Sequence, residues 1–341
     1  MRTIEDLTRK NIRDLAPYKC ARDEFQGEAR IYLDANESPF NAPYDRYPDP
    51  LQKDLKKKIS ALKKVRESQI MLGVGSDEPI DLIERIFCEP RIDNIVSIAP
   101  SYGMYSVEAS VNDIEFREVF LDENFAMNAD KMLAATDSHT TVMFICSPNN
   151  PTGNIIEKTE ILRLLNEWDG IVVIDEAYID FAPEGSSWLT VLDQYEKLIV
   201  LQTFSKAWAM AGIRCGMAFA NEPIIQLMNK VKYPYNMNQL TQEYVSRQLD
   251  KKEEKEEWVK LTISERERVK TELMKQSNVS FVYPSDANFL LVKMDDAKGT
   301  YLRLIDEGII VRNRSNVRLC EGCLRITIGT KEENDELLKA L

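Results

Sequence analysis

The sequence predicts an α/β protein with two parts: a large domain, whose mostly parallel sheet is flanked by helices, and a smaller α+β domain at the C-terminal end. Three observations support this class. From about 68 to 220, short apolar runs alternate with amphipathic stretches of helical period. A long, charged, helix-like stretch then runs through 251–257 to about 275. Short apolar runs return after it. Continuous apolar strands are typical of a parallel sheet, because helices cover both of its faces.

The individual elements can be assigned along the chain. The strands expected in the large sheet are 70–72, 95–98, 142–145, 171–174, 198–201 and 216–219, with helices such as 79–87 and 157–168 between them. The strands expected in the C-terminal part are 279–282, 288–292, 309–311 and 324–328, followed by a helix from Lys331. We therefore divide the chain into an N-terminal arm (1–45), a large α/β domain (46–235), and an interdomain helix with the small α+β domain (236–341).

Composition narrows the possible partners and locations. The 341 residues are 44% hydrophobic and 29% charged, which is enough for a sizeable core. A net charge of -12 argues against a nucleic-acid backbone or an anionic membrane as partner. The N-terminus lacks the apolar run of a signal peptide, and no segment is apolar enough to span a bilayer. Six scattered cysteines fit reduced thiols in the cytoplasm.

Metal and histidine chemistry are disfavoured by residue counts. Only Cys320 and Cys323 form a CxxC pair, whereas a structural zinc site normally needs a second pair of ligands. The single histidine, His139, lies in a polar run and is expected to be a solvated loop residue rather than the base of a hydrolase. We therefore expect no metal site.

Polar residues directly after the apolar runs are the first candidates for a binding site, because sheets of this kind bind ligands beyond the carboxyl ends of their strands. Ser76 and Asp77 precede a helix start that suits an anion, although an ordinary helix cap has the same pattern. The other candidates in such positions are Asn150, Asp175, Tyr178, Thr203, Ser205, Lys206 and Arg214.

Together these residues match the needs of a pyridine aldehyde that carries a phosphate, namely pyridoxal 5'-phosphate. Lys206 would supply the amine that forms a Schiff base with the aldehyde. Asp175 would pair with the protonated ring nitrogen, while Asn150 and Tyr178 would hydrogen-bond the phenolic oxygen.

The remaining candidates would hold the phosphate and the ring. The amides of Ser76 and Asp77, the hydroxyls of Thr203 and Ser205, and the Arg214 guanidinium would bind the phosphate. Tyr105 would stack on the ring face; packing in the core is its alternative.

Longer stretches carry a family resemblance over nearly the whole chain, at 15–18, 33–40, 46–50, 207–216 and 322–330. In these stretches and in the motifs above, the chain resembles the class II pyridoxal-phosphate-dependent aminotransferases of fold type I, and among them the histidinol-phosphate aminotransferases. The resemblance implies a cytoplasmic homodimer that transfers an amino group between L-histidinol phosphate and 2-oxoglutarate. The products would be imidazole acetol phosphate and L-glutamate, in L-histidine biosynthesis.

The resemblance also implies a set of substrate-binding residues. Arg325 would bind the substrate phosphate or the carboxylate of glutamate, with Arg312 assisting, and guanidinium groups suit both anions. Tyr18 and Asn36 would line the same pocket, and Tyr47 would reach cofactor and substrate from the partner subunit.

Several alternatives remain open at this point. Arg314 and Arg318 lie close enough in sequence to share or replace the role of Arg312. An aromatic amino acid aminotransferase or an amino-acid-phosphate decarboxylase would use the same cofactor residues. A non-catalytic pyridoxal-phosphate sensor would need a DNA-binding segment in addition.

Overall fold

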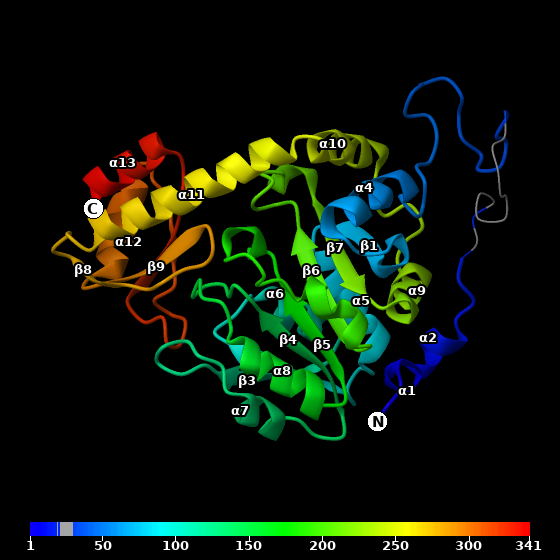
Figure 1. Cartoon of the computed structure of the whole chain (residues 1–341), viewed down its shortest axis with the longest axis horizontal. Coiled ribbons are helices and arrows are strands. Elements are labelled where there is room, and N and C mark those ends of the chain that lie inside the picture. Colours follow the sequence, from blue (N-terminus) through cyan, green and yellow to red (C-terminus); the bar gives the residue numbers. More distant parts are fainter. Residues whose placement is uncertain (19, 21–29) are drawn as a thin grey trace.

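The computed structural model describes residues 1–18, 20 and 30–341, and its main feature is a seven-stranded sheet (Figure 1). The strands are β1 (Ile70–Val74), β2 (Asn94–Ala99), β3 (Glu115–Phe120), β4 (Thr140–Cys146), β5 (Ile171–Asp175), β6 (Leu198–Thr203) and β7 (Cys215–Ala220). Their order is β1-β7-β6-β5-β4-β2-β3, and β7 runs antiparallel to both of its neighbours while the other pairs are parallel. The predicted α/β class is confirmed.

Helices cover both faces of this sheet (Figure 1). They are α4 (Lys53–Lys63), α5 (Asp77–Phe87), α6 (Met104–Val111), α7 (Ala129–Ala134), α8 (Lys158–Glu167) and α9 (Glu222–Val231). Shorter helical turns are η1 (Glu67–Gln69), η2 (Ile179–Phe181), η3 (Trp188–Gln194) and η4 (Ala211–Ile213).

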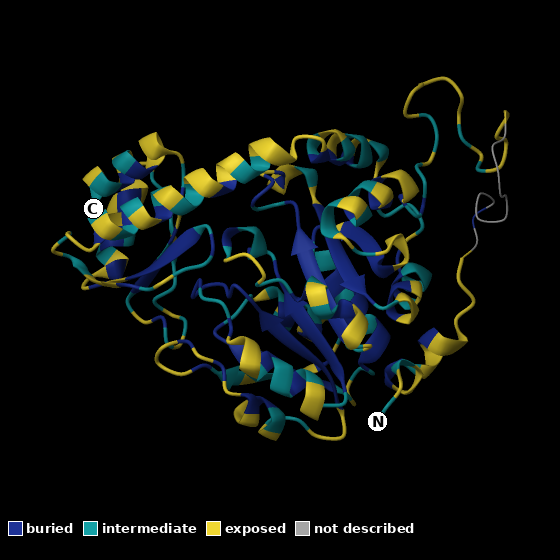
Figure 2. Ribbon diagram, viewed as in Figure 1, coloured by how far each residue is buried: buried dark blue, intermediate teal, exposed yellow. Residues whose placement is uncertain are grey.

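The strands separate two hydrophobic cores, because successive side chains of a strand point to opposite faces. In β5, Val172 and Ile174 pack in the same core as residues of α4 and α8. Ile171 and Val173 pack in the core that contains residues of α5 and α9. The central strands are therefore buried on both sides, and Figure 2 shows them in the colour of buried residues. This double burial explains why their sequences are continuously apolar.

The C-terminal part is built on a four-stranded antiparallel sheet of order β10-β11-β9-β8. Its strands are β8 (Val279–Val282), β9 (Phe289–Met294), β10 (Arg312–Asn313) and β11 (Cys323–Thr327). The accompanying helices are α10 (Gln239–Leu249), α11 (Lys252–Leu273), α12 (Ala297–Asp306) and α13 (Lys331–Ala340). The 22 residues of α11 run from the large sheet to the small one (Figure 1).

Two strand predictions need correction. The strand expected at 309–311 begins three residues later, as the two-residue strand β10. The edge strand β3 was not predicted, because four of its six residues are half-buried and two are exposed, so its sequence lacks the apolar run of the central strands.

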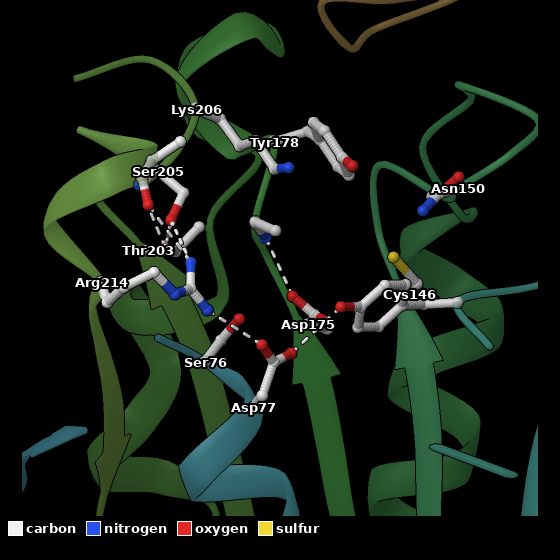
Figure 3. A pocket seen from close by; sticks show the side chains of 13 residues that line it. Ser76, Asp77, Cys146, Asn150, Asp175, Tyr178, Thr203, Ser205, Lys206 and Arg214 are labelled. Carbon is white, nitrogen blue, oxygen red and sulfur yellow. Dashed lines mark hydrogen bonds and ion pairs between the residues drawn. The ribbon is translucent and has the colours of Figure 1, made fainter. Parts of the chain in front are cut away.

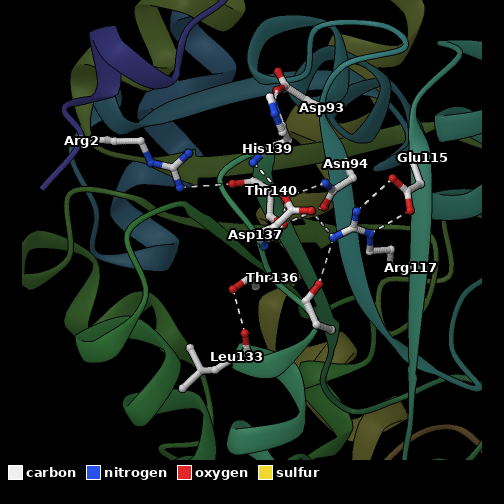
Figure 4. A network of polar contacts seen from close by, with 11 residues as sticks. Arg2, Asp93, Asn94, Glu115, Arg117, Leu133, Thr136, Asp137, His139 and Thr140 are labelled. Carbon is white, nitrogen blue, oxygen red and sulfur yellow. Dashed lines mark hydrogen bonds and ion pairs between the residues drawn. The ribbon is translucent and has the colours of Figure 1, made fainter.

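The edge strand β3 is anchored by a polar network (Figure 4). Arg117 pairs with Glu115 and with Asp137, at 2.8 Å in each case. Asp137 also accepts a hydrogen bond from Asn94 of β2 at 3.0 Å. Asn94 and Arg117 lower the pKa of Asp137 through these hydrogen bonds. His139, in the same network, is largely exposed and lies 3.8 Å from Asp93.

The N-terminal arm begins with the short helices α1 (Ile4–Leu7) and α2 (Lys10–Asp14), and the described residues beyond them extend along the outside of the large domain (Figure 1). In the described residues, no helix combines the length and the apolar character needed to cross a membrane.

Candidate active site

A pocket of about 550 Å³, counting the space at its mouth, lies at one edge of the large sheet. The carboxyl ends of β1, β4, β5 and β6 meet there, and so does the start of β7, because β7 runs in the opposite direction. The residues that line it are Ser76, Asp77, Tyr102, Cys146, Asn150, Asp175, Ala177, Tyr178, Thr203, Ser205, Lys206, Ala211 and Arg214 (Figure 3). Nine of the predicted residues are thus brought together.

Asp175 ends β5 and is held by two hydrogen bonds. Its Oδ2 accepts from the Tyr105 hydroxyl at 2.7 Å, and its Oδ1 accepts from the Ala177 amide at 3.0 Å. Burial raises the pKa of Asp175 to about 6, while these two hydrogen bonds oppose the rise. The carboxylate is therefore fixed in orientation and ionised near neutral pH, as a partner for a protonated ring nitrogen must be.

Lys206 follows β6 in a loop and extends its amine into the pocket (Figure 3). Its Nζ lies 5.4 Å from the centre of the Tyr178 ring. Burial lowers the pKa of Lys206, and the positive charge of Arg325 lowers it further. A lowered pKa increases the fraction of neutral amine, which is the nucleophilic form.

The opposite end of the pocket is lined by groups suited to a phosphate. Helix α5 begins at Asp77, so its first backbone N–H groups lack partners within the helix. The Thr203 and Ser205 hydroxyls lie 2.9 Å apart, and Arg214 donates to Ser205 at 3.5 Å. Amides at a helix start, hydroxyls and a guanidinium together form an anion site.

Backbone geometry brings Arg214 to this site. Arg214 has a φ of 55°, in the left-handed region, directly before β7. Gly75 faces it with a φ of 74°, and a Cβ on Gly75 would lie 2.4 Å from the Arg214 guanidinium. Arg214 also pairs with Asp77 at 3.1 Å. A glycine is thus required where the helix start and the arginine meet.

The expected stacking role of Tyr105 is contradicted by its position. Tyr105 is fully buried in α6, its ring stacks on Phe144 at 4.6 Å, and its hydroxyl is bonded to Asp175. Tyr102, three residues earlier, lines the pocket instead and donates to Asp77 at 3.0 Å. Of the two tyrosines, Tyr102 is therefore the one that faces the pocket.

The two predicted substrate arginines come from the small sheet. Arg325 of β11 donates to the Asn150 side chain, which connects the two sheets at the pocket. Its guanidinium lies 5.4 Å from the centre of the Phe289 ring. Arg312 of β10 is exposed and is paired in register with Arg325.

Three predicted site residues in or just after the N-terminal arm, Tyr18, Asn36 and Tyr47, do not line the pocket of their own chain. Tyr18 and Asn36 are exposed, and Asn36 has a φ of 55°. The Tyr47 ring stacks on Tyr235 with 4.4 Å between ring centres. Sequence reasoning also missed Tyr102, Cys146, Ala177 and Ala211. Cys146 and Ala177 stand beside predicted motifs, so their proximity to a strand end was the available signal.

Comparisons with known proteins show the family of this chain. The model of the family "Aminotransferase class I and II" matches residues 33–341. The histidinol-phosphate aminotransferase of Bacteroides thetaiotaomicron is 54% identical over 342 residues, which cover 100% of this chain and 99% of the relative.

Solved structures of similar proteins share the fold. The histidinol-phosphate aminotransferase from Clostridium acetobutylicum is 28% identical with a TM-score of 0.81, over 87% of this chain and 90% of that chain. The enzyme of the same name from Sinorhizobium meliloti, solved in complex with pyridoxal-5'-phosphate, is 23% identical with a TM-score of 0.81, over 90% and 88%.

The chain therefore belongs to the class I and II aminotransferases and, among these, to the histidinol-phosphate aminotransferase family.

Proposed function

We propose that the chain transfers an amino group between L-histidinol phosphate and 2-oxoglutarate, with pyridoxal 5'-phosphate held at Lys206. The observation that carries the proposal is the convergence of Lys206, Asp175 and Arg214 on one pocket. Relatives named for this activity are about half identical over the whole chain, which supports the choice of substrate.

The pocket residues fit the cofactor. The α5 amides, Thr203, Ser205 and Arg214 would hold its phosphate, and Asp175 would hold its ring nitrogen. Asn150 and Tyr178 would bind its phenolic oxygen. When bound, pyridoxal 5'-phosphate supplies an electron sink for the carbon that loses a proton.

The chain's own groups supply the acid–base chemistry. With the cofactor bound, the amine of Lys206 would be the base that takes the proton from the substrate carbon, and its ammonium form would then donate that proton to the C4′ carbon of the cofactor. Its lowered pKa favours the neutral form that this step requires. Asp175, ionised and fixed by Tyr105 and Ala177, would keep the ring nitrogen of the cofactor protonated.

The test is Lys206→Ala, compared with the wild type in cofactor absorbance and turnover. We expect the variant to bind the cofactor without the absorbance band of covalent attachment and to lose turnover. Normal turnover by Lys206→Ala would refute the assignment. Rates with L-histidinol phosphate and with phenylalanine distinguish the proposed substrate from an aromatic amino acid, and released carbon dioxide would indicate a decarboxylase.

A homodimer in the cytoplasm completes the proposal. Tyr47 and its neighbours lie outside their own pocket, and the arm exposes Leu33 and Phe40 at 89% and 91%. Exposed apolar side chains on a projecting arm suit contact with a second copy. Gel filtration with light scattering should give twice the mass of the chain, and a monomer would contradict the assembly.

A further inference from the structure

The strand pair β10–β11 brings a third arginine, Arg314, beside the two predicted substrate arginines. Arg312 lies opposite Arg325 in this antiparallel pair. The Arg314 amide donates to the carbonyl of Cys323 at 2.9 Å, so the pairing continues one residue past the end of β10. Residues two apart on a strand share a face. Arg312, Arg314 and Arg325 therefore belong to the same face of the small sheet.

The charges of this group are not balanced by acidic side chains. Among residues 1–18, 20 and 30–341, none of the three arginines forms an ion pair with a carboxylate. The Nε atoms of Arg314 and Arg325 are buried and have no hydrogen-bond acceptor in that part of the chain. Burial lowers the pKa of Arg314, and the charges of Arg325 and Arg312 lower it further. Like charges held together in this way are unfavourable unless an anion joins them.

Other arginines of the chain show what a purely structural role involves. Arg318, four residues later on the same segment, places its guanidinium carbon 3.9 Å from the centre of the Phe120 ring. The buried Arg266 donates to the carbonyl of Ala287 at 2.9 Å and pairs with Glu267. Arg314 has no comparable partner among the described residues, and its charge acts on Tyr178, which lines the pocket.

We propose that Arg314 is a further anion-binding residue of the substrate site, and that it makes the site prefer a phosphate monoester over a carboxylate. The proposal rests on the proposed function. A phosphate monoester carries about -1.5 to -2 charges near neutral pH and three acceptor oxygens. The side-chain carboxylate of glutamate carries one charge and two oxygens. A third guanidinium therefore favours the phosphate more strongly than the carboxylate.

The test is Arg314→Gln in the cofactor-loaded enzyme, with Arg318→Gln as matched control. We expect KM for L-histidinol phosphate to rise roughly 10-fold or more, because a hydrogen bond to a charged group is lost. KM for glutamate in the other half-reaction should change less than about threefold. Inorganic phosphate binding, measured by calorimetry, should weaken in Arg314→Gln and stay unchanged in Arg318→Gln. Arg314→Lys should keep part of the preference, since it retains the charge without the planar fork.

The outcomes separate this role from a structural one. Equal changes in KM for both substrates, or equal effects of Arg314→Gln and Arg318→Gln, would overturn the proposal. An unchanged KM for glutamate shows that Arg314→Gln is folded and loaded. If the wild type turned over no L-histidinol phosphate, the proposed function would fail, while the phosphate titration would still decide whether Arg314 binds phosphate.

Discussion

Glu84 is a buried carboxyl group in α5, and its replacement by glutamine tests the packing of that helix quantitatively. The residue is 0% exposed, and neither carboxyl oxygen accepts a hydrogen bond from the described residues. Burial raises the pKa of Glu84 from 4.5 to about 9; the nearby charges of Glu108 and Asp81 add to the rise, and the nearby Asn112 side chain opposes it. In the folded chain the group is therefore neutral at physiological pH.

The raised pKa of Glu84 determines how much the stability of the chain changes with pH. Between pH 4.5 and about 9 the unfolded chain releases this proton while the folded chain keeps it. The free energy of unfolding then falls by about 1.4 kcal/mol per pH unit, or about 4 kcal/mol by pH 7.5 as an upper bound. Glu84→Gln cannot ionise, so it should lose this dependence and gain stability over the wild type as pH rises.

The assay is urea unfolding followed by circular dichroism from pH 5.5 to 8.5. The difference between Glu84→Gln and wild type should grow steadily with pH, whatever its value at the lowest pH. Glu84→Leu, which is also neutral, should give the same slope with a different offset, because it leaves no buried polar atom unpaired. A difference that stays constant with pH would show that Glu84 does not hold its proton in the folded chain.

Three further substitutions test the site and its support. Tyr105→Phe removes a hydrogen bond that lowers the pKa of Asp175, so the carboxylate should protonate more readily. Cofactor affinity should fall about fivefold, and more at pH 6 than at pH 8, in a fluorescence titration; equal loss at both would contradict this role. Gly216→Ala places a Cβ 2.3 Å from the backbone of Gly75, so the backbone at the phosphate end of the pocket must shift. Cofactor binding, measured by equilibrium dialysis, should therefore weaken; unchanged binding would show that the backbone can shift without cost to the site. Glu176→Gln replaces one oxygen of a buried carboxylate that accepts from three donors, and chemical denaturation should show a loss of about 1–3 kcal/mol; no loss would show that the donors find other acceptors.

Much of the pocket could be predicted because strand ends are visible in sequence. Asp175 and Lys206 each follow a continuous apolar run, and parallel strands bring their carboxyl ends to one edge. Arg214 precedes its strand, and it reaches the same edge because β7 is antiparallel. Arg214 was predicted because it lies in the stretch 207–216, which directly follows Lys206 and carries the family resemblance. The rule that ligands bind beyond the carboxyl ends of strands would not have selected it.

The local sequence could not predict whether Tyr102 or Tyr105 faces the pocket. Both are tyrosines in one short segment, and the helix α6 begins between them at Met104. Tyr105 therefore turns with the helix toward Phe144, while Tyr102 stays at the pocket. The position of Tyr47 could not be predicted from local sequence either. Its ring contacts Tyr235, which lies far away in the sequence.

The ion pair between Asp77 and Arg214 has a consequence for how the phosphate end of the pocket is loaded. With this pair in place, the entrance carries no net charge from its two ionised side chains, so long-range attraction for an arriving dianion is weak. Capture would then depend mainly on short-range, directional donors, namely the amide, hydroxyl and guanidinium groups already in position. We therefore expect the affinity of this end of the pocket for a phosphate to depend only weakly on ionic strength, because salt screens charge–charge attraction more than short hydrogen bonds.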